Sequence, residues 1–222
     1  MNERIERLGA VATRLLFENG DVKVWEMDVP SGARFPHHHH SLEYLFYVIA
    51  PAILTVSRHG VDPYEVDARE RALYFYPGDK SETFLNNGPG PYREVLVELK
   101  RMPRADQKPL SFMKCEALIG QKPKPGIIRI VENDRITVSE TMIKAETEAI
   151  VAHPRDAVTY VIEGARMGIA EHHNGARGSH AGVSDREEER PAGGVYWEPA
   201  GTSRKLRNLG PAAYRQLTVE LK

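Results

Sequence analysis

The chain lacks several features that would indicate particular classes of protein. It has one cysteine, Cys115, in 222 residues, so no internal disulfide framework can form. Its 30 basic and 31 acidic residues nearly cancel, which argues against a nucleic-acid or anionic-membrane partner. No apolar run reaches membrane-spanning length, and the N-terminal MNERIERLGA lacks the apolar segment of a secretory signal. We therefore expect a soluble cytoplasmic protein.

Helix-periodic segments and nucleotide-binding or hydrolase motifs are scarce as well. The chain has no glycine-rich phosphate loop, nucleophile elbow or Cys-x-x-Cys pair, which argues against nucleotide binding and triad hydrolysis. What it contains are short alternating or β-branched runs separated by glycine and proline, at residues 22–29, 53–56, 72–76 and 94–99 of the first half. This pattern predicts an all-β fold, a small antiparallel sandwich or barrel.

The sequence is an internal duplication. Glu18 recurs as Glu132 and His39 as His153, both at an offset of 114 (132 − 18 = 114). Later residues recur at an offset of 122, from Tyr74, Pro77, Ser81, Asn86, Gly88, Pro89, Tyr92 and Arg93 to Tyr196, Pro199, Ser203, Asn208, Gly210, Pro211, Tyr214 and Arg215. The larger offset places eight extra residues in a polar surface loop of the second copy, roughly residues 170–192.

The repeat also sets the expected domain boundaries. Residues 1–100 form an N-terminal domain and residues 127–222 a C-terminal domain. Residues 101–126, which contain several prolines, read as a linker that packs partly onto the domains.

The run His37 to His40, followed by Glu43 and an apolar strand, is the strongest sign of chemistry. Residues two apart in a strand share a face, so one pair of imidazoles can converge and Glu43 can join it after a turn. Because the repeat pairs His39 with His153, it favours His37 and His39. His38 and His40 remain the competing pair.

Around these residues the chain resembles the cupin superfamily. The first cupin motif is a glycine, His-x-His, three or four residues and a glutamate, matched by Gly32, the histidine run and Glu43, although the interval from Gly32 to His37 is one residue short. The second motif is Pro-x-Gly, two residues, a histidine, three residues and an asparagine. Its positions are held by Pro77, Asp79, Glu82 and Asn86 in the first copy and by Pro199, Gly201, Arg204 and Asn208 in the second.

The resemblance implies a bicupin: two tandem jelly-roll β-barrels joined by the proline-rich linker. The ends of the two copies are similar to small cupins linked to β-alanine degradation. Since strand-exchanged dimers are common among cupins, the resemblance also allows a homodimer, although the duplication can supply that contact within one chain.

The same resemblance implies a divalent metal ion in the first copy, held by His37, His39, Glu43 and Glu82. Glu82 stands where a third histidine is usual. Two imidazoles and two carboxylates suit Fe, Mn, Ni or Zn, with the extra carboxylate favouring the harder Mn²⁺ or Fe²⁺. Alternatively, Glu82 is a catalytic general base beside a metal that has three ligands.

The second copy lacks such ligands, because Val151, His153, Ala157 and Arg204 hold the four positions. We expect it to be free of metal and to serve as a structural half. Alternatively, Arg204 and His153 bind an anion such as a carboxylate or phosphate.

Two functions follow from these expectations. The first is a metal-dependent enzyme, dioxygenase-like or isomerase-like, that acts on a small organic acid or dicarbonyl in the N-terminal barrel only. The alternative is a non-catalytic cupin that binds a small molecule or serves as an assembly module.

Overall fold

The computed structural model describes residues 9–171 and 186–222. Residues 1–8, used above to argue against a secretory signal, and residues 172–185, in the enlarged loop, lie outside the described residues. Within the described ranges all helix and strand elements are β-strands, so the all-β prediction is confirmed. No helix in these ranges is long and apolar enough to cross a membrane.

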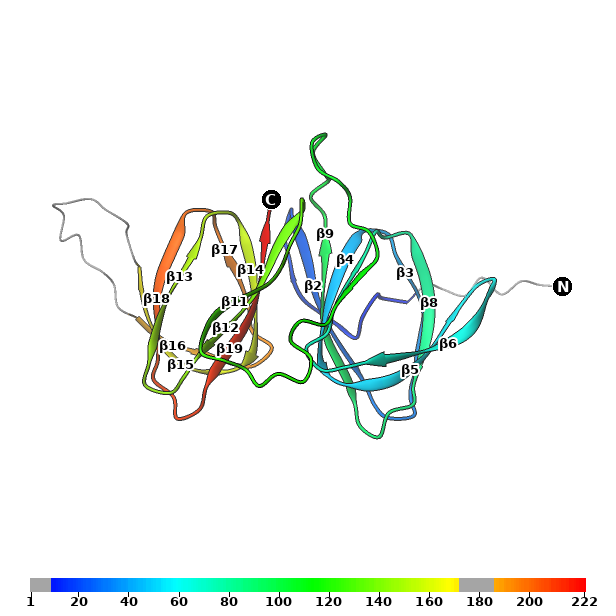
Figure 1. Cartoon of the computed structure of the whole chain (residues 1–222), viewed down its shortest axis with the longest axis horizontal. Coiled ribbons are helices and arrows are strands. Elements are labelled where there is room, and N and C mark those ends of the chain that lie inside the picture. Colours follow the sequence, from blue (N-terminus) through cyan, green and yellow to red (C-terminus); the bar gives the residue numbers. More distant parts are fainter. Residues whose placement is uncertain (1–8, 172–185) are drawn as a thin grey trace. The chain divides into compact units, whose positions relative to one another are not determined.

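The chain divides into two compact units, Met1–Gln121 and Lys122–Lys222, each built from two antiparallel sheets (Figure 1). In the first unit a six-stranded sheet has the order β1-β2-β9-β4-β7-β10 and a four-stranded sheet the order β3-β8-β5-β6. Its strands are β1 (Arg14–Glu18), β2 (Val22–Val29), β3 (Arg34–His40), β4 (Glu43–Ala50), β5 (Ala52–Arg58), β6 (Val61–Ala68), β7 (Leu73–Tyr76), β8 (Lys80–Asn86), β9 (Tyr92–Leu99) and β10 (Met113–Cys115).

The second unit repeats this topology. Its sheets have the orders β11-β12-β19-β14-β17 and β13-β18-β15-β16, which correspond strand by strand to those of the first unit, apart from the additional edge strand β10. Its strands are β11 (Gly126–Glu132), β12 (Ile136–Ile143), β13 (Glu148–His153), β14 (Ala157–Glu163), β15 (Ala165–Glu171), β16 (Arg186–Arg190), β17 (Val195–Glu198), β18 (Thr202–Asn208) and β19 (Tyr214–Leu221).

Two segments that the sequence analysis expected to be irregular contribute strands. Residues 101–121 of the expected linker lie in the first unit, where β10 pairs with β7 as an edge strand. In the expected surface loop of the second copy, residues 186–190 form β16 and pair with β15.

Side chains from both sheets of the first unit meet in one core. Met27 of β2 and Tyr74 of β7 pack in the same buried cluster as Leu54 of β5 and Phe84 of β8. Alternation of apolar and polar residues along each strand explains this arrangement, because every second side chain points into the space between the sheets.

A buried asparagine closes the same loop in each unit. Asn86 is fully buried, and its amide group donates to the carbonyls of Val29 and Gly90, while its side-chain oxygen accepts from the Gly88 N–H. Asn208 makes the equivalent three bonds to Ile143, Ala212 and Gly210. The asparagine of the second cupin motif is therefore a structural clamp.

We expect Asn86→Ala to lower the free energy of unfolding by about 2–3 kcal/mol, because three buried backbone groups lose their partners. Urea unfolding of the full chain measures this. Asn87→Ala is the matched control, since the Asn87 side chain bonds only at the exposed surface, to Thr55; its expected cost is below about 0.5 kcal/mol. Equal costs for the two variants would contradict the clamp.

Candidate functional site

A one-residue bulge in β3 determines which histidines face the interior of the first unit. Phe35 of β3 lies opposite Phe84 of β8, and His38 lies opposite Glu82. Three steps along β3 therefore match two along β8, so one extra residue is accommodated between Phe35 and His38. Such an insertion interrupts the ladder locally and re-aims the side chains that follow it.

The second unit lacks this bulge. Ala149 lies opposite Leu206 and Val151 opposite Arg204, with a continuous register between them. The structural counterpart of His38 is therefore Val151, at an offset of 113 (151 − 38 = 113), and the offset of 114 holds only before the bulge. By the same register His153 corresponds to His40.

The side chains of His38 and His40 face inward and are 1% and 2% exposed. His39 points to the other side, where its Nδ1 lies 2.8 Å from the Ser81 hydroxyl and its Nε2 lies 3.7 Å from Asp79. His37 is half-buried, and its carbonyl accepts the Gly9 N–H. A shift of one residue in a strand reverses every side chain, so the repeat-based preference for His37 and His39 did not select the inward pair.

Glu43 does not join the inward histidines either. Its carboxylate accepts the backbone N–H of Leu110 at 2.6 Å, and it does not line the interior cavity. Its neighbour Tyr44 lines the cavity instead, with its ring stacked on that of His40 at 4.0 Å. In the first cupin motif, the interval between the glycine and the first histidine fits Gly32 and His38. This interval is the signal in the sequence that indicates the inward pair.

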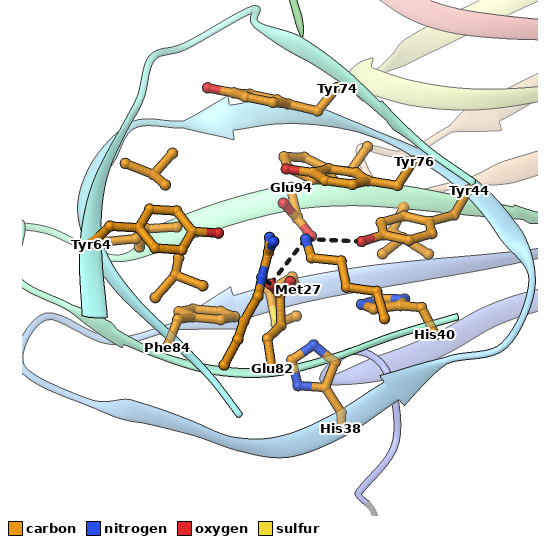
Figure 2. Close-up of a pocket in the computed structure, with 17 residues that line it drawn as sticks. Met27, His38, His40, Tyr44, Tyr64, Tyr74, Tyr76, Glu82, Phe84 and Glu94 are labelled. Atoms are coloured by element: carbon orange, nitrogen blue, oxygen red, sulfur yellow. Dashed lines mark hydrogen bonds and ion pairs between the residues drawn. The ribbon is translucent and has the colours of Figure 1, made fainter. Parts of the chain in front are cut away.

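The structure brings His38, His40 and Glu82 together, with one potential ligand atom from each within 4.8 Å of the others. They lie on neighbouring strands β3 and β8 and face a cavity of about 50 Å³ in the first unit (Figure 2). No other group of three such side chains was found in residues 9–171 and 186–222. Of the four predicted metal ligands, only Glu82 is at this point.

Both inward imidazoles are held neutral. Burial lowers the pKa of His38, and its Nδ1 lies 2.9 Å from the Pro36 carbonyl, so Nδ1 carries the proton and Nε2 keeps its lone pair. Burial, together with the positive charge of the nearby Lys80, lowers the pKa of His40 to about 2. The Nδ1 of His40 is buried without a hydrogen-bond partner. Neutral imidazole is the form that binds metal ions.

Two cations compensate Glu82. Its carboxylate lies 2.9 Å from Lys80 Nζ and 3.1 Å from Arg58 Nε. Lys80 Nζ also lies 3.6 Å from the centre of the Tyr76 ring and donates to the Tyr44 hydroxyl at 3.3 Å. Burial lowers the pKa of Lys80 to about 8, although the carboxylate opposes the shift. Sequence reasoning missed both residues. Arg58 reaches Glu82 only through the pairing of β5 with β8, whereas Lys80 lies two residues before Glu82 on β8, so alternation along that strand was a signal that could have found it.

A second carboxyl group, Glu94 of β9, lines the same cavity and is 4% exposed (Figure 2). It accepts a hydrogen bond from the Tyr92 hydroxyl. Burial raises the pKa of Glu94 to about 8, so this group carries a proton at neutral pH.

The cavity opens into an outer cleft of about 570 Å³. Arg58, Lys80 and the rings of Tyr64 and Tyr76 line both spaces. Phe112, from the segment 101–121 that the sequence analysis assigned to the linker, also lines the outer cleft. Its ring centre lies 5.1 Å from that of Tyr76, and the residue is 61% exposed. The entrance is thus aromatic and carries charges of both signs, because Glu65 and Asp67 line the outer cleft together with Arg58, Lys80 and Lys114.

The second unit has the same cross-strand ion pair with its charges reversed. Arg204 holds the position of Glu82, and its Nε lies 3.1 Å from Glu171, which holds the position of Arg58. Arg204 is also paired with Glu198. Two carboxylates already neutralise the guanidinium, and Arg204 does not line the cavity of His153. The arrangement therefore lacks the unbalanced positive charge that the alternative anion site at His153 and Arg204 needs.

Comparisons with known proteins identify the fold. A scan against known protein families and a search of curated proteins find no match. Among solved structures, AerE from Microcystis aeruginosa is similar with a TM-score of 0.59 and 10% identity, covering 95% of this chain and 97% of that one. A mutant of the Bacillus subtilis oxalate decarboxylase gives 0.61 and 12%, covering 96% and 78%. The Lactobacillus farciminis oxalate decarboxylase–formate complex also gives 0.61 and 12%, covering 92% and 78%.

These likenesses show that the chain has the cupin fold, as the resemblance of its motifs implied. At 10–12% identity they concern the fold alone. Activity has to be argued from the site itself.

The buried His153 makes stability depend on pH. Burial, with the charges of Arg204 and Arg190, lowers its pKa from 6.5 to about 4. Between these values the unfolded chain binds more protons than the folded one, so stability falls as the pH drops from 6.5 towards 4. The loss attributable to His153 approaches about 3 kcal/mol at the acid end.

We therefore expect the unfolding free energy of the wild type, minus that of His153→Gln, to fall steadily from pH 6.5 to pH 4. Urea unfolding in the presence of a chelator measures both proteins. His38 and His40 shift in the same direction but are present in both, so the difference isolates His153. Parallel pH profiles would contradict the assignment.

Proposed function

We propose that the chain is a metal-dependent bicupin whose first unit acts on a small organic acid or dicarbonyl. The observation that carries the proposal is the convergence of His38, His40 and Glu82 in one buried cavity. In this proposal the two units are tandem cupin barrels, and chemistry is confined to the first.

The three side chains fit a divalent ion. Ligand atoms about 2.1 Å from one ion lie at most about 4.2 Å apart, so atoms now within 4.8 Å need side-chain shifts of roughly half an ångström. Both imidazoles are neutral, and the buried His40 Nδ1 has no hydrogen-bond partner. Two histidines and one carboxylate are typical of non-haem Fe(II) sites, and harder ions such as Mn²⁺ also accept carboxylate. The Bacillus subtilis oxalate decarboxylase, which has Mn(II) centres, shares the fold.

When bound, such an ion supplies a Lewis acid that polarises the oxygens of a carboxylate or carbonyl substrate. The surrounding residues would do the rest. Lys80 and Arg58 provide positive charge for the substrate's carboxylate once Glu82 turns towards the ion. Glu94 holds a proton at the cavity wall and can donate it. In this scheme Glu82 is a ligand; its role as general base is the alternative from the sequence.

One observation favours a second candidate, a non-catalytic binder. Glu82 is already compensated by Lys80 and Arg58, so the cluster is electrically satisfied without an ion. In that case the aromatic cleft would bind a small molecule without turning it over, or the chain would serve as an assembly module.

Several finer predictions belong to the same proposal. A dioxygenase-like or isomerase-like reaction, a relation to the small cupins of β-alanine degradation and a homodimer are supported by the motif resemblance and the cupin fold. A cytoplasmic location is supported by the single cysteine, Cys115, because disulfide-free chains suit a reducing compartment.

We expect His38→Ala and His40→Ala each to lower bound metal at least tenfold, because each removes one of three ligands. Protein prepared without an affinity tag and incubated with Mn²⁺, Fe²⁺ or Zn²⁺ under anaerobic conditions would be analysed by inductively coupled plasma mass spectrometry. His37→Ala and His39→Ala are the matched controls, since both side chains lie outside the cavity. Equal metal content in all four variants would contradict the site.

Activity separates the two candidate functions. We expect metal-loaded protein to consume at least one member of a panel of small dicarboxylates and dicarbonyls. Oxygen uptake and mass spectrometry of the products measure the reaction. The rate should fall at least a hundredfold in His40→Ala and persist in His39→Ala. Saturable anion binding, with no turnover and no stoichiometric metal, would instead support the non-catalytic binding protein.

A further inference from the structure

The two units differ at one set of inward positions beside the site. Trp25 of the first unit lies opposite Leu96, whereas the same pair in the second unit is Ser139 opposite Thr218. Two large apolar side chains are thus replaced by two small hydroxyl side chains. Protein interiors are close-packed, so such a replacement leaves space unless a neighbour fills it.

The next inward pair shows a related change. Met27 lies opposite Glu94 in the first unit, and Thr141 lies opposite Gln216 in the second. The tyrosine hydrogen bond is retained, since the Tyr214 hydroxyl donates to Gln216 at 2.8 Å. The thioether has been replaced by another hydroxyl.

The space is present as a cavity of about 280 Å³ in the second unit. Four hydroxyl side chains line it: Thr137, Ser139, Thr141 and Thr218. At about 30 Å³ per water-sized group, the cavity has room for roughly nine non-hydrogen atoms. This is the size of a small metabolite.

Two further polar groups line the same cavity. His153 is 5% exposed, and its Nδ1 is buried with no hydrogen-bond partner. That atom lies 3.6 Å from a carboxylate oxygen of Glu220, too far for a hydrogen bond. In the first unit the equivalent Glu98 accepts the Trp25 indole N–H at 2.8 Å. Ser139 provides no such donor, so Glu220 lacks the indole bond.

The buried Nδ1 of His153 has no hydrogen-bond partner, and the Glu220 carboxylate lacks the indole donor of the first unit. A ligand in the cavity that bonds to both groups would therefore be stabilised. The lowered pKa of His153 keeps this ring neutral, so it can donate from one nitrogen and accept at the other. A ligand hydroxyl between His153 and Glu220 could satisfy both groups.

We propose that this cavity binds a small neutral polyhydroxylated molecule, a polyol of about four or five carbons. Four hydroxyl side chains offer matched donors and acceptors, and Val151 and Pro154 provide apolar surface for the C–H faces of such a ligand. An anion is disfavoured because Glu220 lines the cavity and the one cation there, Arg129, is paired with Glu132 at 2.6 Å. The proposal is independent of the metal site.

The test uses the full chain with methyl-labelled threonine, titrated with erythritol or xylitol and followed by NMR. We expect saturable shifts of the methyl signals of Thr141 and Thr218 with at least one of these probes. Thr141→Val keeps the volume but removes the hydroxyl, and should weaken binding at least fivefold. Ser139→Trp restores the side chain of the first unit and should abolish it.

The matched control is Thr147→Val, an exposed threonine of the second unit whose hydroxyl bonds to the Lys144 carbonyl. Its affinity should equal that of the wild type. No saturable shift with any neutral probe would overturn the proposal, as would binding unchanged in both Thr141→Val and Ser139→Trp. Shifts with malonate but not with the neutral probes would overturn the assigned ligand class.

Discussion

The alternation of side chains on β3 is the constraint on which the candidate site depends. One extra residue between Phe35 and His38 turns His38 and His40 inward, where burial keeps them neutral and directs them to Glu82. Without that register the four consecutive histidines would be ambiguous, because any strand presents two of them to each face. The bulge therefore selects the pair of imidazoles that can bind a metal ion together.

Charge compensation is the second organising feature. A carboxylate or guanidinium in a protein interior needs a partner, and both units meet this need at the same pair of strand positions. The first unit uses Arg58 with Glu82 and the second uses Glu171 with Arg204. Reversal of the pair preserves the fold while replacing a carboxylate that suits a cation by a guanidinium that repels one. The two units thus share an architecture and differ in chemistry.

Large-to-small differences between the copies account for the remaining interior space. The first unit packs Trp25, Met27 and Leu96 on the inner face of its larger sheet, whereas the second presents hydroxyl groups there. The consequence is a tight cavity beside the histidines in one unit and a polar one in the other. A duplicated fold can in this way carry two different pockets without any change in strand order.

The sequence by itself determined the all-β class, the duplication and the motif positions of Asn86 and Asn208, because alternation, turn residues and internal repeats can be read directly along the chain. It also located the histidine run and Glu82. It did not determine which histidines converge, because a bulge arises from the pairing of two strands. The sequence offset between the two copies does not reveal it. Nor could it place Arg58 and Glu94 around the cavity, because those contacts join different strands. Lys80 lies two residues before Glu82 on β8, so alternation by itself could have placed it on the same face. Tertiary structure decided these points, through strand register and the burial that shifts each group's pKa.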